Sequence, residues 1–198
     1  MGISLEDVKK LKELTGLGLG DAKGALVEAE GDFDKALEAL RKKGLTKAEK
    51  KGDRETREGI VDSYVHSDRI GVVVEVNCET DFVARLPEFR EFAHQMAMQI
   101  AAMNPTYPTL EDIPVDIYEA KKAELMASDA LKSKPADIAE KIVEGQLKKH
   151  FGEQVLTEQA YVLDDSITVG ERIKQQVAKH GENLRVSQFK RIELGVSE

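Results

Sequence analysis

Side chains that could act as acids, bases or metal ligands are scattered along this chain. A hydrolytic or metal site would need histidines at a fixed spacing such as HExxH, and no such spacing occurs. The four histidines lie far apart in sequence: His66, His94, His150 and His180. We therefore expect neither a metal site nor acid–base catalysis by these residues.

Nucleophilic and nucleotide-binding chemistry are also poorly supported. Cys78, the single cysteine, falls on the apolar side of a predicted strand, where burial disfavours a reactive thiolate. The segment GLGLG, residues 16–20, follows a predicted helix and not a strand, which argues against a dinucleotide loop. These patterns predict a protein that is not an enzyme and has no cofactor.

A stronger candidate is the junction formed by Thr80, Asp81 and Phe82 within VEVNCETDFVAR. Two interpretations are open. Thr80 could cap a short helix, with Asp81 complementing the helix dipole and Phe82 packing inward. Alternatively, the turn presents Asp81 and Phe82 to a partner, because aromatic anchors are frequent binding hot spots and a carboxylate can compete for a cation.

In the second interpretation, the elements around this junction form a rigid platform. A period-2 alternation predicts a half-buried strand whose inward residues are Ile70, Val72, Val74, Val76 and Cys78. After the junction, Pro87 starts a predicted helix that ends at Asn104-Pro105. Its predicted inward residues are Phe89, Phe92, Ala93, Met96, Ile100 and Met103.

The remaining pattern of residues 59–198 predicts an α+β core, with a small antiparallel sheet backed by helices. Two β-rich runs flank Ser67-Asp68 and predict a hairpin, which LRVSQFKRIEL at the end of the chain could join. Helical patterns cover about 115–127 and 135–150. Thr168 and Glu171 predict a capping box for a further helix that stops at Gly181.

Residues 1–44 predict a separate bundle of three short helices. The first carries Leu5, Val8, Leu11 and Leu14 on one face, Asp21 is the predicted cap of the second, and the third ends at Gly44. Residues 45–58 are mostly charged and read as a linker or a poorly packed helix extension.

Composition narrows the function further. Hydrophobic residues make up 41% of the 198 residues and charged residues 33%, enough for a folded core. The net charge is −8, residues 1–58 are neutral, and no basic stripe suggests nucleic-acid binding. A single cysteine, no apolar run long enough for a membrane span and no secretory signal lead us to expect a cytoplasmic protein.

Several segments resemble the bacterial elongation factor Ts family. EVNCETDFVAR (75–85) is similar to its core signature, and LKELTGLGLGDAKGAL (11–26) to its N-terminal signature, apart from Lys12 and Gly24. GDFDKALEALRKKG is similar to the family's N-terminal module, a three-helix bundle of the ubiquitin-associated (UBA) type, and KIVEGQLKKHF and TVGERIK match later segments.

This resemblance implies a guanine-nucleotide exchange factor for elongation factor Tu. The turn Thr80-Asp81-Phe82-Val83 would enter the Mg²⁺ and phosphate side of the partner's nucleotide site. Phe82 would act as a wedge and Asp81 would disturb magnesium coordination. The factor would do no covalent chemistry of its own.

The resemblance also implies other contacts. The bundle would dock on the partner's nucleotide-binding domain. Leu17 and Leu19 could each either contact the partner or close the bundle core. Leu19 is the preferred contact residue, because the family has a large apolar residue there in contact with the partner. Longer relatives carry two core sub-domains and short ones dimerise, so a homodimer in a complex with two partner molecules is implied. His66 and Arg69, at the hairpin tip of the other subunit, would then contact the partner.

Two other classes remain as alternatives. A UBA-type adaptor without exchange activity would explain the bundle but would give the Thr80–Val83 turn no role. An enzyme would need a pocket of convergent polar groups. An exposed Phe82 on a convex ridge favours exchange, and a deep polar cleft favours an enzyme.

Overall fold

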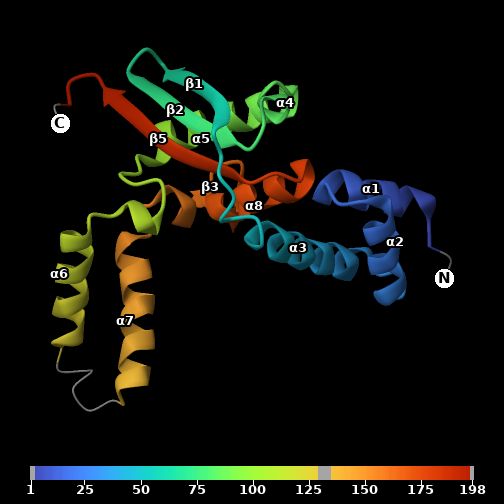
Figure 1. Cartoon of the computed structure of the whole chain (residues 1–198), viewed down its shortest axis with the longest axis horizontal. Helices are drawn as coiled ribbons and strands as arrows, with labels where there is room; N and C mark the ends of the chain where they lie inside the picture. The colour runs from blue at the N-terminus through green and yellow to red at the C-terminus, as the bar shows by residue number, and fades with distance from the viewer. Residues whose placement is uncertain (1–2, 129–134, 197–198) are drawn as a thin grey trace.

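The computed structural model describes residues 3–128 and 135–196; the other residues of the predicted domains, 1–2, 129–134 and 197–198, lie outside the described part. The helices are α1 (Leu5–Thr15), α2 (Leu19–Glu28), α3 (Phe33–Glu49), α4 (Asp81–Ala84), α5 (Pro87–Met103), α6 (Val115–Met126), α7 (Ala136–Phe151) and α8 (Val169–His180). The strands are β1 (Glu58–His66), β2 (Ile70–Cys78), β3 (Ala160–Tyr161), β4 (Asp164–Thr168) and β5 (Leu184–Glu193). The 3-10 turns are η1 (Leu110–Asp112) and η2 (Leu156–Glu158). Three helices thus precede an α+β core, which confirms the predicted fold class (Figure 1).

The main sheet contains three antiparallel strands in the order β1-β2-β5. Ser67 and Asp68 turn the β1–β2 hairpin with positive φ angles of 49° and 57°. Such left-handed turn residues match the twist of the flanking strands. The predicted hairpin and the predicted addition of the final strand are both confirmed.

One face of this sheet is buried against α5, which lies behind the strands in Figure 1. The residues of β2 buried on this face are Val72, Val74, Val76 and Cys78, as predicted. The buried apolar residues of α5 are Phe89, Phe92, Ala93, Met96, Ala97, Ile100 and Ala101. Pro87 begins the helix and Asn104 ends it in the left-handed conformation. Met103 was predicted to point inward, but it is exposed because the helix reaches the edge of the core there.

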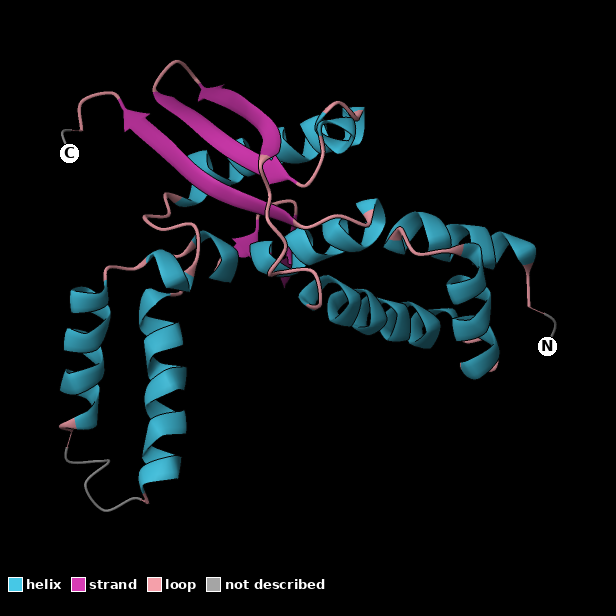
Figure 2. Ribbon diagram, viewed as in Figure 1, coloured by secondary structure: helices cyan, strands magenta, loops and turns pink. Residues whose placement is uncertain are grey.

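The α6 and α7 helices form an antiparallel pair that projects away from the sheet (Figure 2). This pair has its own small core, in which Tyr118 stacks on Phe151 with ring centroids 6.0 Å apart. Both helices lie close to their predicted ranges.

The N-terminal bundle differs from prediction at several points. Leu5 and Leu14 are exposed, so the buried face of α1 is narrower than predicted. The second helix begins at Leu19 after Gly18, and Asp21 does not cap it, because the Asp21 carboxylate pairs with Lys43 of α3 at 2.8 Å.

The third helix passes through Gly44 and ends at Glu49. Of the two readings of residues 45–58, the helix extension is therefore right for the first five, and Ala48 is buried in the main core. Gly44 lies in a crossing with α8, where an added Cβ would be 3.6 Å from that of Ala178. The glycine serves helix packing here and does not terminate the helix.

The α8 helix joins the bundle to the core. Thr168 and Glu171 form the predicted capping box, with bonds of 3.1 and 3.0 Å, and Gly181 ends the helix in the left-handed conformation. α3 runs beside α8, and Lys174 pairs with Glu49 at 2.9 Å. Among the described helices, none is long and apolar enough to cross a membrane.

Candidate functional site

The candidate site is the short helix α4, which follows β2 directly. Thr80 is its N-cap, with an extended backbone (φ −128°, ψ 152°), and its hydroxyl accepts a hydrogen bond from the Val83 N–H at 3.4 Å. The first interpretation of the junction, in which Thr80 caps a short helix, is therefore right about the cap. Its other part, an inward Phe82, is wrong, because 77% of Phe82 is exposed.

The residues of α4 divide into an outer and an inner pair. Asp81 and Phe82 point to solvent, and the Asp81 carboxylate pairs with Arg85 at 2.9 Å on the outer side. Val83 and Ala84 are buried in the main core. Val83 thus anchors the helix, and the groups available to a partner are those of Asp81 and Phe82.

The start of α4 is tied to the turn between α8 and β5. The Glu182 carboxylate accepts hydrogen bonds from the backbone N–H groups of Glu79 and Thr80, at 3.1 and 3.0 Å. The Glu79 carboxylate in turn accepts from the Asn183 N–H at 2.6 Å. Sequence reasoning missed Glu182 and Asn183: they lie about a hundred residues from the junction and carry no motif.

Cys78 borders the same turn but has no nucleophilic character. Its side chain is fully buried and its Sγ donates to the Thr80 carbonyl at 3.1 Å. Burial, with a smaller effect of nearby Glu182, raises the pKa of the Cys78 thiol from its ordinary value of 9.0 to about 11. The thiol is therefore protonated at neutral pH.

The other predicted contact residues lie elsewhere on the molecule. Leu19, at the start of α2, is 52% exposed, whereas Leu17 is buried in the bundle core. His66 and Arg69 are exposed at the hairpin tip, where His66 Nδ1 lies 2.9 Å from the Tyr64 hydroxyl. Figure 1 shows the bundle, the hairpin tip and α4 well apart, so they do not form one site.

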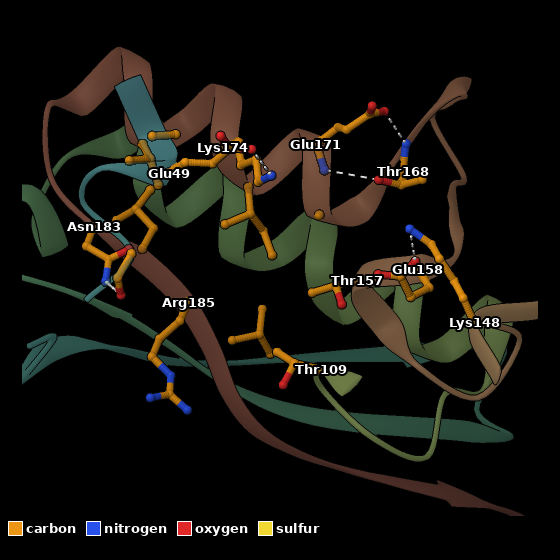
Figure 3. Close-up of a pocket in the computed structure, with 17 residues that line it drawn as sticks. Glu49, Thr109, Lys148, Thr157, Glu158, Thr168, Glu171, Lys174, Asn183 and Arg185 are labelled. Atoms are coloured by element: carbon orange, nitrogen blue, oxygen red, sulfur yellow. Dashed lines mark hydrogen bonds and ion pairs between the residues drawn. The ribbon is translucent and has the colours of Figure 1, made fainter. Parts of the chain in front are cut away.

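A groove of about 540 Å³ lies between the end of α3, α8 and the start of β5 (Figure 3). Its apolar residues are Ala48, Ile173, Val177, Leu184 and Val186. The carboxylates at its rim already have partners: Glu49 pairs with Lys174, and Glu158 with Lys148, each at 2.9 Å. A third, Glu171, is engaged in the capping box. Each of these three carboxylates is therefore already held by another group of the protein.

No group of three or more His, Cys, Asp or Glu side chains is placed to hold a metal ion in the described residues. The site thus consists of an exposed acid–aromatic tip on an α+β core that also carries a helical bundle. Comparison with known proteins identifies the family.

The family model described as "Elongation factor TS" matches residues 24–196. The elongation factor Ts of Thermotoga petrophila is 52% identical over 196 residues, which cover 98% of each chain. That of Fervidobacterium nodosum is 49% identical over 98% of this chain and 100% of its own. That of Thermodesulfovibrio yellowstonii is 47% identical over 100% of this chain and 99% of its own. The chain belongs to the elongation factor Ts family, a family of translation elongation factors.

Proposed function

We propose that this protein is a guanine-nucleotide exchange factor that binds elongation factor Tu in its GDP form and promotes release of GDP. The observation that carries the proposal is the exposed Phe82 on a short helix whose other side is buried in the core. Exposed aromatic side chains are frequent anchors of protein–protein interfaces, and here the adjacent Asp81 supplies a carboxylate at the same tip. The proposed location is the cytoplasm, where translation takes place.

The residues of α4 have separate roles in this proposal. Phe82 inserts as a wedge between side chains of the partner, and Asp81 brings a carboxylate toward the Mg²⁺ and phosphate side of the nucleotide site. Thr80 and Val83 hold the helix in place through the cap and the core. Arg85, paired with Asp81, must yield this carboxylate when the complex forms.

The exchange activity needs no covalent step, because binding and release are linked. A factor that binds the nucleotide-free state more tightly must weaken nucleotide affinity by the same ratio. The chain would thus catalyse exchange without being an enzyme in the chemical sense. The exposed Leu19 supports a second contact, through the bundle, with the partner's nucleotide-binding domain.

We also propose that the protein works as a homodimer bound to two partner molecules. The sheet face opposite α5 carries exposed apolar residues that a second copy would cover: Val61, Val65, Val73 and Ile192. Cross-strand pairing brings Val65, Gly71 and Ile192 into one row at the hairpin end of the sheet. The tip with His66 and Arg69 is then offered to the partner molecule held by the other subunit.

The test is release of a fluorescent GDP analogue from elongation factor Tu. Wild type is expected to accelerate release. The acceleration by Phe82→Ala is expected to be roughly thirtyfold smaller, which is the size of effect expected for a binding hot spot. Asp81→Ala is expected to lose less. Val115→Ala, at an equally exposed apolar residue on α6, serves as the matched control and should behave as wild type.

The outcomes separate the candidate functions. Phe82→Ala with full activity would leave exchange standing and remove the role of α4. No acceleration by wild type would overturn the exchange function and favour the adaptor, in which the bundle alone binds a partner.

A further inference from the structure

The turn between α8 and β5 holds the start of α4 through one carboxylate. Oε2 of Glu182 accepts hydrogen bonds from the backbone N–H of Glu79 (3.1 Å) and of Thr80 (3.0 Å). Oε1 of Glu182 accepts a third from the Thr80 hydroxyl at 2.7 Å. One side chain therefore satisfies two backbone donors at the end of β2 and also fixes the residue that caps α4.

The connection is reciprocal. The Glu79 carboxylate accepts from the Asn183 N–H at 2.6 Å and lies 3.5 Å from Arg54. The side-chain amide of Asn183 (Nδ2) donates to the backbone carbonyls of Gly52 (3.0 Å) and Arg54 (2.8 Å). The segment after α3, the α8–β5 turn and the start of α4 are thus bonded into one unit.

Such support matters because α4 cannot hold itself in place. It has four residues, and so short a helix gains little from its own hydrogen bonds. Val83 and Ala84 fix its inner side in the core, but Phe82 is 77% exposed and has little packing to orient it. The bonds to Glu182 hold both the backbone N–H and the hydroxyl of Thr80, one residue before Asp81.

We propose that Glu182 is a positioning residue that holds α4 in the orientation in which Asp81 and Phe82 act on the partner. The inference rests on the exchange function proposed above. Glu182 acts through Thr80 and Glu79 and is not itself the wedge. If the tip is already ordered before it binds, no binding free energy is lost in ordering it. More of the binding free energy is then available to displace the nucleotide.

The first test measures GDP release from elongation factor Tu over a range of factor concentrations. Glu182→Ala is expected to lower the maximal release rate roughly tenfold, as for loss of hydrogen bonds to a charged group, with little change in the half-saturating concentration. A variant that only reduced the folded fraction would raise the half-saturating concentration and keep the maximum. Glu119→Ala, an exposed glutamate on α6, is the matched control.

Near-isosteric variants keep the test valid if Glu182→Ala fails to fold. Glu182→Gln retains the shape but removes the negative charge and one of the two acceptor oxygens, and Thr80→Val removes the hydroxyl that bonds to Glu182. Both should lower the maximal rate. The double variant with Glu182→Gln and Thr80→Val should lower the maximal rate by less than the product of the two single effects, because both changes break the same contact.

Amide hydrogen exchange gives a readout that needs no partner. In Glu182→Gln the amides of Glu79 and Thr80 should exchange faster, while those of the central strand β2 remain protected. Unchanged protection at these amides, or a maximal rate equal to that of wild type, would overturn the positioning role alone. A wild type without exchange activity would instead overturn the proposed function, and the positioning role with it.

Discussion

At the residue scale, Cys78 shows how the junction combines a reactive residue type with an unreactive environment. The thiol is fully buried, and its pKa is raised to about 11. With a pKa of about 11 instead of the ordinary 9.0, the native protein should contain roughly a hundredfold less thiolate than the unfolded chain at pH 8. Alkylation by iodoacetamide should therefore be slow in native protein and fast in urea, as followed by mass spectrometry. Rapid alkylation of the folded chain would contradict this environment.

His180 predicts a dependence of stability on pH. Burial, together with the neighbouring Lys179 charge, lowers the pKa of His180 below its ordinary value of 6.5, against smaller opposing effects of Glu88 and Glu182. The Gln176 amide can donate to its Nε2 at 3.2 Å, a bond that requires the neutral ring. The fold thus favours neutral His180, and the unfolded chain binds more protons as the pH falls below 6.5.

The free energy of unfolding should accordingly decrease as the pH falls from 6.5 toward the lowered pKa of His180. Urea titrations between pH 8 and pH 5 would measure this decrease in wild type, His180→Gln and the exposed-site control His150→Gln. The decrease should be smaller in His180→Gln and unchanged in His150→Gln. Equal pH dependence in all three would show that His180 contributes nothing to it.

At the scale of elements, the packing of the bundle on α8 depends on a close approach at Gly16. This residue ends α1 with φ +67°, and an added Cβ would lie 2.6 Å from the Cβ of Lys179. Gly16→Ala should destabilise the protein by about 2 kcal/mol or more, since it adds this clash to left-handed strain. Gly24→Ala, inside α2 with open space around it, should stabilise it by about 0.5–1 kcal/mol. Thermal unfolding measures both; a harmless Gly16→Ala would mean that the bundle is not held against α8.

Local patterns predicted those elements whose residues carry their own signals. The alternation in β2 identified its buried face, and Thr168 with Glu171 identified the start of α8. Contacts between distant segments gave no such signal. Gly44 looked like a helix end because its role, the close approach of Ala178, is visible only after folding.

The same limit applies to the short hairpin and to the site. The strands β3 and β4 were not predicted, because one has two residues and the other is polar, so neither has an apolar alternation. For the site, Asp81 and Phe82 are adjacent in sequence and could be singled out together. Glu182 could not, since nothing in the sequence distinguishes it from other glutamates that follow a helix.

At the scale of the whole molecule, β2 separates the two ends of the proposed contact surface. The hairpin tip precedes β2 and α4 follows it, and eight residue steps along a strand span about 26 Å. A rigid sheet of this length keeps Arg69 and Phe82 of one subunit from meeting at one point on a partner. In the proposed homodimer, each partner molecule would meet α4 of one subunit and the hairpin tip of the other.

The dimer proposal predicts that a charge on the sheet face opposite α5 will separate the subunits. Val73 is exposed at the centre of that face, between Ser63 of β1 and Lys190 of β5. Val73→Lys places a second cation beside Lys190 and should convert a dimer into a monomer without unfolding the sheet, because the side chain points away from the core. Light scattering at micromolar concentrations would measure the mass, with Val115→Lys on α6 as the control for an added surface charge. Reductant should change nothing, since Cys78 is buried. A monomeric wild type would refute the dimer. A Val73→Lys variant that stays dimeric would show that the dimer interface lies elsewhere on the molecule.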